Sequence, residues 1–97
     1  MADPVRLPNG IEVIIILPGQ ALDPCGYCVW RIEIKGTARP VPFGAMDFWH
    51  GIGLPELLES LPDLLRCYID SNIVDEHWPE IEKAMTVLYV QYHAEAA

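Results

Sequence analysis

The sequence has few of the residues from which active sites are usually built. Its 97 residues include only two serines, two threonines, three histidines and three cysteines. It contains no G-x-S-x-G, no G-x-x-x-x-G-K, no H-E-x-x-H and no dinucleotide-binding glycine fingerprint. The longest apolar run, Val13 to Leu17, is far too short to span a bilayer. We therefore expect a protein that is not an enzyme, binds no cofactor or metal and does not insert into a membrane.

Basic residues are also scarce, and the charges are unevenly distributed. Lys and Arg number 6 against 14 Asp and Glu, which gives a formal net charge of -8. Residues 1–46 are balanced, whereas residues 47–97 carry all of the excess, with only Arg66 and Lys83 opposing their acids. Recognition of nucleic acids and anionic membranes needs clusters of Lys and Arg. The charge therefore predicts a basic protein as partner, for a chain that is itself a monomer or a homodimer.

Length, composition and cysteine content predict the general class. At 52% hydrophobic and 21% charged, the chain can form the core of a single domain over residues 1–97. No secretory signal pattern is visible at the N-terminus, and an odd number of cysteines suits a reducing compartment. These features predict a cytoplasmic protein.

The first half of the sequence reads as β-structure. Pro8-Asn9-Gly10 is a turn signal that places the first ordered element at Ile11, and the β-branched run 11–17 predicts a central, well-buried strand. Residues 27–35 alternate, which predicts a strand with Trp30, Ile32 and Ile34 on the core face. Residues 37–45 contain Pro40 and Pro42 and predict only a short extended segment at a sheet edge.

The second half reads as helical from about Met46. Asp47 could cap a first turn, but the better start is Leu54 with Pro55 in the first turn, and leucines then recur every three or four residues. Pro62 predicts a kink or restart near residue 60. Residues 70–73 read as a connection, and a second helix follows over 74–92, with strand as an alternative for 86–92. The predicted fold is α+β: a short antiparallel sheet of two to three strands packed on one face against two helices.

Two sets of residues could carry chemistry. Cys25 and Cys28 have the spacing of a disulfide or half a zinc site, but the motif leads into a strand and no second ligand pair follows. His50 and His77 each adjoin a tryptophan and could act in acid–base catalysis if Asp47, Asp75 or Glu76 oriented the ring. Unreactive cysteines, and pairs of one core tryptophan with one surface histidine, explain these patterns more simply.

The acids of the helical half are the strongest functional signal. Few of them can form the i,i+4 pairs with lysine that stabilise helices, and three aromatic residues lie near them as candidate interface anchors. Acids at the start of the final helix would also be stabilised by the positive end of the helix dipole. Stabilisation of the helix is therefore an alternative to partner binding as the role of these acids. The predicted partner-binding residues are Asp47, Phe48, Trp49, Glu56, Glu59, Asp75, Glu76, Trp78, Glu80 and Glu82.

One segment resembles a known class of protein. The stretch from Pro42 to Asp47, followed by the leucine-rich segment 54–61, is similar to small bacterial immunity-type proteins, which inhibit polymorphic or contact-dependent toxins. In these a strand ends in an aliphatic or aromatic residue, Gly, any residue and Asp, and a leucine-rich helix then packs back across a short sheet; the strand 28–32 fits too. The resemblance covers roughly residues 11–70 and implies a protein that neutralises a toxin domain, such as a nuclease, by tight binding. The alternatives are a phage-encoded inhibitor that mimics nucleic acid and a small thiol or zinc module using Cys25 and Cys28.

Overall fold

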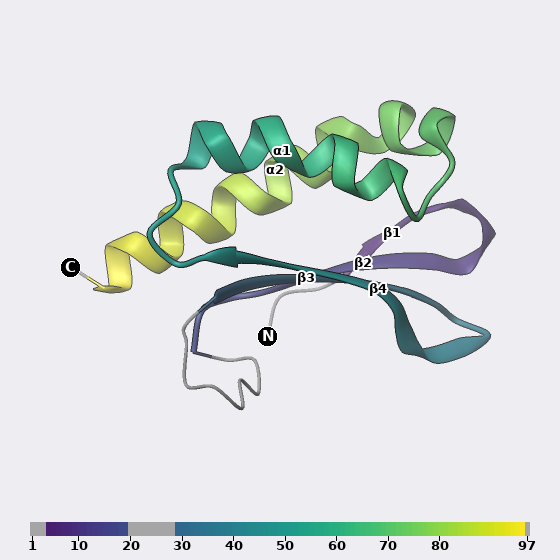
Figure 1. Ribbon diagram of the computed structural model, residues 1–97, viewed down its shortest axis with the longest axis horizontal. Coiled ribbons are helices and arrows are strands. Elements are labelled where there is room, and N and C mark those ends of the chain that lie inside the picture. The colour runs from purple at the N-terminus through teal and green to yellow at the C-terminus, as the bar shows by residue number, and fades with distance from the viewer. Residues whose placement is uncertain (1–3, 20–28, 97) are drawn as a thin grey trace.

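Four antiparallel strands form one sheet in the order β1-β2-β3-β4, and two helices cover one of its faces (Figure 1). The computed structural model describes residues 4–19 and 29–96, with the backbone alone at residues 39, 40 and 96. The elements are β1 Val5–Arg6, β2 Ile11–Ile16, β3 Val29–Gly36, β4 Arg39–Trp49, α1 Leu54–Arg66 and α2 Ser71–Ala96. The predicted α+β class is confirmed, with four strands instead of two or three.

The chain becomes ordered earlier than the sequence predicts. β1 pairs with β2, and the turn between them is Pro8–Gly10, where Asn9 and Gly10 have φ of 66° and 72°. Asn and Gly are the residues that tolerate this left-handed conformation, so the turn signal was correct. The prediction of a first element at Ile11 was wrong, because the turn folds the preceding residues back onto β2.

Strands β2 and β3 supply the centre of the core. In β3 the core face of Trp30, Ile32 and Ile34 is confirmed, since all three are fully buried. Val13 and Ile15 of β2 lie opposite Ile34 and Ile32 and are also buried. β2 is central, as predicted, because it pairs with both β1 and β3. Val13 and Ile15 are buried and the other residues of β2 are half-buried, so the strand is less completely buried than expected.

Strand β4 is much longer than predicted. It lies at the sheet edge, as Pro40 and Pro42 indicated, but it continues to Trp49 instead of ending near residue 45. A register shift opposite Ile34 and Gly36 accommodates the proline-containing part of β4. The predicted change towards helix at Met46 was therefore wrong: Met46 and Asp47 both belong to β4, where Met46 lies opposite Ile32. Asp47 does not cap a helical turn, which agrees with the preference for a helix start at Leu54.

Helix α1 begins at Leu54 as predicted and lies over the sheet. Its leucine stripe is buried at Leu57, Leu61 and Leu65, which join Trp30 and the isoleucines of the sheet in one core. Pro62 does not restart the helix, which is continuous to Arg66. The buried leucines on either side of Pro62 hold the helix against the core, and this packing offsets the missing hydrogen bond.

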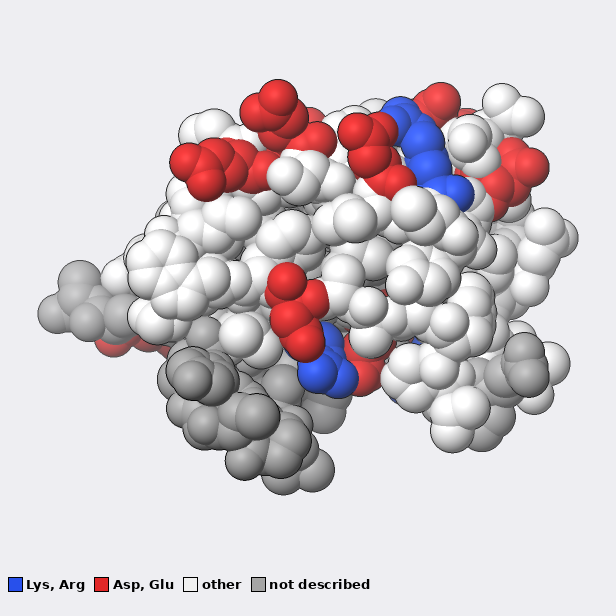
Figure 2. Space-filling model, in the orientation of Figure 1, with Lys and Arg blue, Asp and Glu red and all other residues white. Residues whose placement is uncertain are grey.

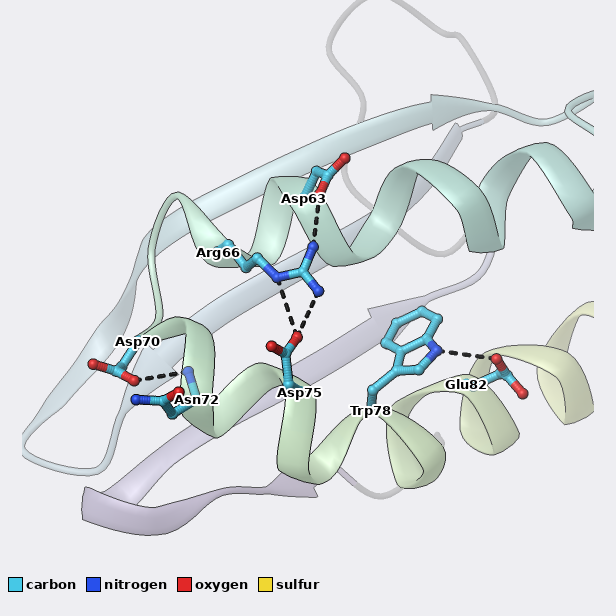
Figure 3. Close-up of polar contacts among 7 residues, drawn as sticks. All are labelled: Asp63, Arg66, Asp70, Asn72, Asp75, Trp78 and Glu82. Atoms are coloured by element: carbon cyan, nitrogen blue, oxygen red, sulfur yellow. Dashed lines mark hydrogen bonds and ion pairs between the residues drawn. The ribbon is translucent and has the colours of Figure 1, made fainter.

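Helix α2 begins earlier than predicted and runs alongside α1. The predicted connection 70–73 was wrong for residues 71–73, because the helix starts at Ser71. Asp70, just before it, accepts a hydrogen bond from the backbone N–H of Asn72 at 2.8 Å (Figure 3). A carboxylate in this place caps the first turn by satisfying an N–H group without an intrahelical partner. Residues 86–92 are helical, so the preferred prediction for them is confirmed.

The cap gives a direct test of where α2 starts. We expect Asp70→Ala to lower the free energy of unfolding by about 1 kcal/mol, because the first turn loses its side-chain acceptor. Asp70→Asn keeps an acceptor oxygen and is expected to remain close to the parent. Urea denaturation followed by circular dichroism measures both variants, and equal losses in the two would contradict the cap.

Candidate functional site

The exposed surfaces of α1 and α2 carry the acids that the sequence singled out. We define the acidic helical surface as seven carboxylates: Glu56, Glu59, Asp63, Asp75, Glu76, Glu80 and Glu82. All seven are exposed, and Figure 2 shows acidic side chains along the side of the molecule formed by the helices. With Glu95 the two helices have eight acids and two bases, Arg66 and Lys83.

The sheet has the opposite balance. Its four strands contain three acids, Glu12, Glu33 and Asp47, and four bases, Arg6, Arg31, Lys35 and Arg39. On the face away from the helices, the Asp47 carboxylate accepts two hydrogen bonds from Arg31, at 2.9 and 3.0 Å. The negative charge of the chain is thus concentrated in the helical layer.

Arg66 forms ion pairs with two carboxylates of the acidic helical surface, one from each helix. Its guanidinium lies between the helices, with Nη1 2.6 Å from Asp63 of α1 and Nη2 2.5 Å from Asp75 of α2 (Figure 3). The hydrogen bond to Asp75 raises the pKa of the Arg66 guanidinium above its ordinary value. This bridge links residues 9 apart in sequence, and only the antiparallel pairing of the helices brings them together. Asp75 is therefore partly neutralised within the fold.

The other acids of α2 lie too far from its N-terminus to be stabilised by the helix dipole. Because α2 begins at Ser71, its first turn contains no acid, and Asp75 is the first one along the helix. The favourable effect of the dipole on negative charge falls off within the first turn. The prediction that these acids lie at the start of the final helix was therefore wrong, and the competing structural role is removed for Glu80 and Glu82.

Two of these acids make contacts within α2. Glu82 accepts a hydrogen bond from the indole Nε1 of Trp78 at 3.0 Å, and Glu80 lies 3.8 Å from His77 Nδ1 (Figure 3 shows the first). Trp78 is half-buried and packs against the core, so it is an incomplete anchor for a partner. Glu56, Glu59 and Glu76 form no ion pair or side-chain hydrogen bond within the described residues, which leaves their charges available to a partner.

The three candidate residues of β4 do not join the acidic helical surface. Asp47 and Trp49 alternate with Phe48 along the strand, so Phe48 faces the core whereas Asp47 lies on the opposite face of the sheet beside Arg31. Phe48 and Trp49 lie at the end of β4, beside the connection that contains Gly51 and Gly53, whereas Trp78 lies within α2. Of the three candidate aromatic residues, Phe48, Trp49 and Trp78, only Trp49 is exposed, at 66%, and it is therefore accessible to a partner.

The histidine and cysteine candidates have the following surroundings in the structure. Asp47 pairs with Arg31 and Asp75 with Arg66, while the carboxylate of Glu80 lies 3.8 Å from His77 Nδ1. Trp49 is exposed, which contradicts its expected place as a core tryptophan. In the described ranges no group of three His, Cys, Asp or Glu side chains could hold a metal ion, while Cys25 and Cys28 lie outside those ranges.

Two further findings concern membrane-spanning helices and similarity to known proteins. Among the helices in the described residues, none combines the length and apolar character needed to cross a membrane. Comparison with protein-family models, with curated proteins and with solved structures found no match to this chain.

Proposed function

We propose that this protein is a non-enzymatic acidic inhibitor of the immunity class, which binds a basic toxin domain such as a nuclease through its acidic helical surface. The observation that carries the proposal is the segregation of charge: eight acids and two bases on the helices, against three acids and four bases on the strands. A fold needs no such arrangement, because uncompensated carboxylates on neighbouring helices repel one another.

The chemistry of a basic partner fits this surface. A nuclease domain uses Lys and Arg to bind phosphates, and a surface that offers carboxylates at high density competes for the same cations. Opposite potentials also speed encounter, which matters for an inhibitor that has to bind before its target acts. Glu56, Glu59 and Glu76, which are exposed and unpaired within the described residues, are the residues best placed for this steering.

The experiment reverses charge on α1 and measures association. Candidate partners are the products of neighbouring genes, tested first for toxicity that co-expression of this protein relieves. For a partner so identified, Glu56→Lys with Glu59→Lys is expected to slow association at low salt by about tenfold or more and to weaken its salt dependence. The stability of the variant is expected to stay within about 0.5 kcal/mol per site of the parent.

Two controls locate the effect. Glu56→Gln with Glu59→Gln removes the charges without reversing them, so its association rate is expected to lie between parent and lysine variant. Glu95→Lys reverses an exposed acid in the last turn of α2, outside the acidic helical surface, and is expected to change the rate least. Equal rates and equal salt slopes for all variants would exclude the helices from the interface.

A further inference from the structure

The outer edge of β4 is an open sheet edge. β4 is the last strand in the order β1-β2-β3-β4, and within the part of the chain that the structure describes it pairs only with β3. Figure 1 views the molecule from this side, with β4 and α1 in front. An edge strand has backbone N–H and C=O groups on its free side, and these groups can pair with another strand.

Only the first part of this edge is protected. Pro40 and Pro42 cannot donate hydrogen bonds, and the register shift near Ile34 and Gly36 makes this part irregular. From Gly44 to Trp49 the strand is regularly paired with β3 and contains neither proline nor lysine. Its one charge, Asp47, is already bound by Arg31. The devices that usually prevent edge-to-edge pairing are therefore missing over 44–49.

Apolar side chains are exposed around the same edge. Seven large hydrophobic residues are exposed among those described, and five belong to β4, to α1 or to the turn after α1: Val41, Phe43, Trp49, Leu64 and Tyr68. Figure 2 shows the molecule from this side. Most of the surface between the charged residues of the helices, at the top, and a smaller charged group below them is uncharged. Such a concentration of apolar surface marks an interaction site more often than scattered single residues do.

The charge distribution favours a second copy of this chain as the occupant. Two acidic helical surfaces repel each other, so they oppose contact between copies through the helices. The strands are close to neutral, with three acids and four bases, and impose no such barrier. Identical chains can therefore approach most easily edge to edge.

The side-chain pattern of β4 then selects one register, and we propose that two copies pair antiparallel through their β4 edges about a two-fold axis at Met46. Within the regular part of the strand this register places Ala45 of each copy opposite Asp47 of the other, and it brings Phe43, the residue just before that part, beside Trp49 of the other copy. Both members of the aromatic pair are exposed in the single chain, at 39% and 66%, and cross-strand aromatic pairs stabilise sheets.

The neighbouring symmetric registers are less favourable. An axis at Asp47 places the two Asp47 carboxylates directly opposite each other, which is destabilising. An axis at Ala45 brings Pro42 into the pairing opposite Phe48, where it cannot donate a hydrogen bond. Shifts by one residue would place core-facing side chains opposite outward-facing ones. The axis at Met46 avoids all three conflicts.

The dimer that follows is one continuous sheet, four strands from each copy, with all helices on the same side. The two-fold axis is perpendicular to the sheet, so each copy keeps its core face toward its own helices. The acidic helical surfaces do not take part in the strand pairing. The inference is thus independent of the proposed function, and a basic partner could bind a dimer or a monomer.

Sedimentation velocity of the full chain tests the proposal. We expect the parent to form a dimer as its concentration rises, and Trp49→Lys and Phe43→Lys each to raise the dimer dissociation constant at least tenfold. Val87→Lys is the matched control: Val87 is 55% exposed, close to the 66% of Trp49, and the charge change is the same, but the residue lies on α2. A parent that stays monomeric at all concentrations, or three variants that dimerise equally, would overturn the proposal.

Two further measurements identify the interface. Added salt is expected to leave the dimer unchanged or strengthen it, because both copies are acidic, whereas salt weakens the binding of a basic partner. The failure of one proposal is therefore distinguishable from the failure of the other. Backbone hydrogen exchange in residues 44–49 is expected to slow as the dimer forms. Protection on α2 instead, or protection of 44–49 only by a different protein, would reject a second copy at this edge.

Discussion

Trp30→Ala is expected to lower the free energy of unfolding by about 3–5 kcal/mol, the usual cost of removing a large buried aromatic side chain. Trp30 is fully buried in β3, where it joins the sheet to the C-terminal half of α2. Its ring stacks with Tyr89 at a centroid distance of 5.8 Å and meets Tyr92 edge-on at 5.3 Å. The substitution therefore leaves a cavity between the two layers and removes both aromatic contacts.

The indole nitrogen contributes nothing to this loss. Within the described residues Trp30 Nε1 has no hydrogen-bond partner although it is buried, so the side chain stabilises the fold by packing alone. We therefore expect Trp30→Phe, which keeps a ring and removes the unpaired donor, to cost much less than Trp30→Ala. Denaturation followed by far-UV circular dichroism gives the three free energies without relying on tryptophan fluorescence.

An exposed tryptophan provides the matched control. Trp49 is 66% exposed, so Trp49→Ala is expected to stay within about 0.5 kcal/mol of the parent when measured at a concentration where the chain is monomeric. Similar losses for Trp30→Ala and Trp49→Ala would contradict the assignment of faces in β3 and β4.

The core was predictable because its signals are periodic and local. Alternation in 27–35 identifies Trp30, Ile32 and Ile34 directly, since side chains of a strand point to opposite faces in turn. The leucine stripe of α1 is equally direct, and Leu57 and Leu61 are fully buried as the spacing requires. The exception is Leu64 of α1, which has the same spacing but is exposed.

The extent of β4 was not predictable by the same means. Pro40 and Pro42 indicate only a short extended segment, and the register shift that accommodates them depends on the neighbouring β3. The pairing of Asp47 with Arg31, 16 residues earlier, depends on the register between β3 and β4, which local sequence does not specify. The alternation of Met46 and Phe48 with Asp47 and Trp49 was present in the sequence, but it is short and begins in a proline-rich segment.

The candidate surface was predicted in part. Exposure of the helix acids follows from their spacing, so Glu56, Glu59 and Glu76 were identified correctly as solvent-exposed. The bridge from Arg66 to Asp75 depends on how the two helices lie against each other, and periodicity carries no information on that. The start of α2 was different, because the Asp70 cap is a local signal that was visible in the sequence and was misread as a connection.

Gly44→Ala is expected to destabilise the protein by about 1–3 kcal/mol, because a methyl group there has no room. A Cβ atom at Gly44 would lie 2.6 Å from Cδ1 and 2.8 Å from Cγ of Tyr68, whose ring covers this position. Cγ is at the root of the ring, so rotating the ring does not relieve the contact. Tyr68 is also held by its backbone N–H, which donates to the Leu65 carbonyl at 3.0 Å. Adding the methyl group thus moves the turn between α1 and α2 away from β4.

A double-mutant cycle separates this clash from a general intolerance of alanine in β4. With Tyr68→Ala in place, Gly44→Ala is expected to cost much less than in the parent, so the two changes are strongly non-additive. Gly51→Ala is the control, since its Cβ would meet the outer atoms of the Trp49 ring, which is mostly exposed and can swing aside. Additive free energies in the cycle would show that Tyr68 does not pack over Gly44.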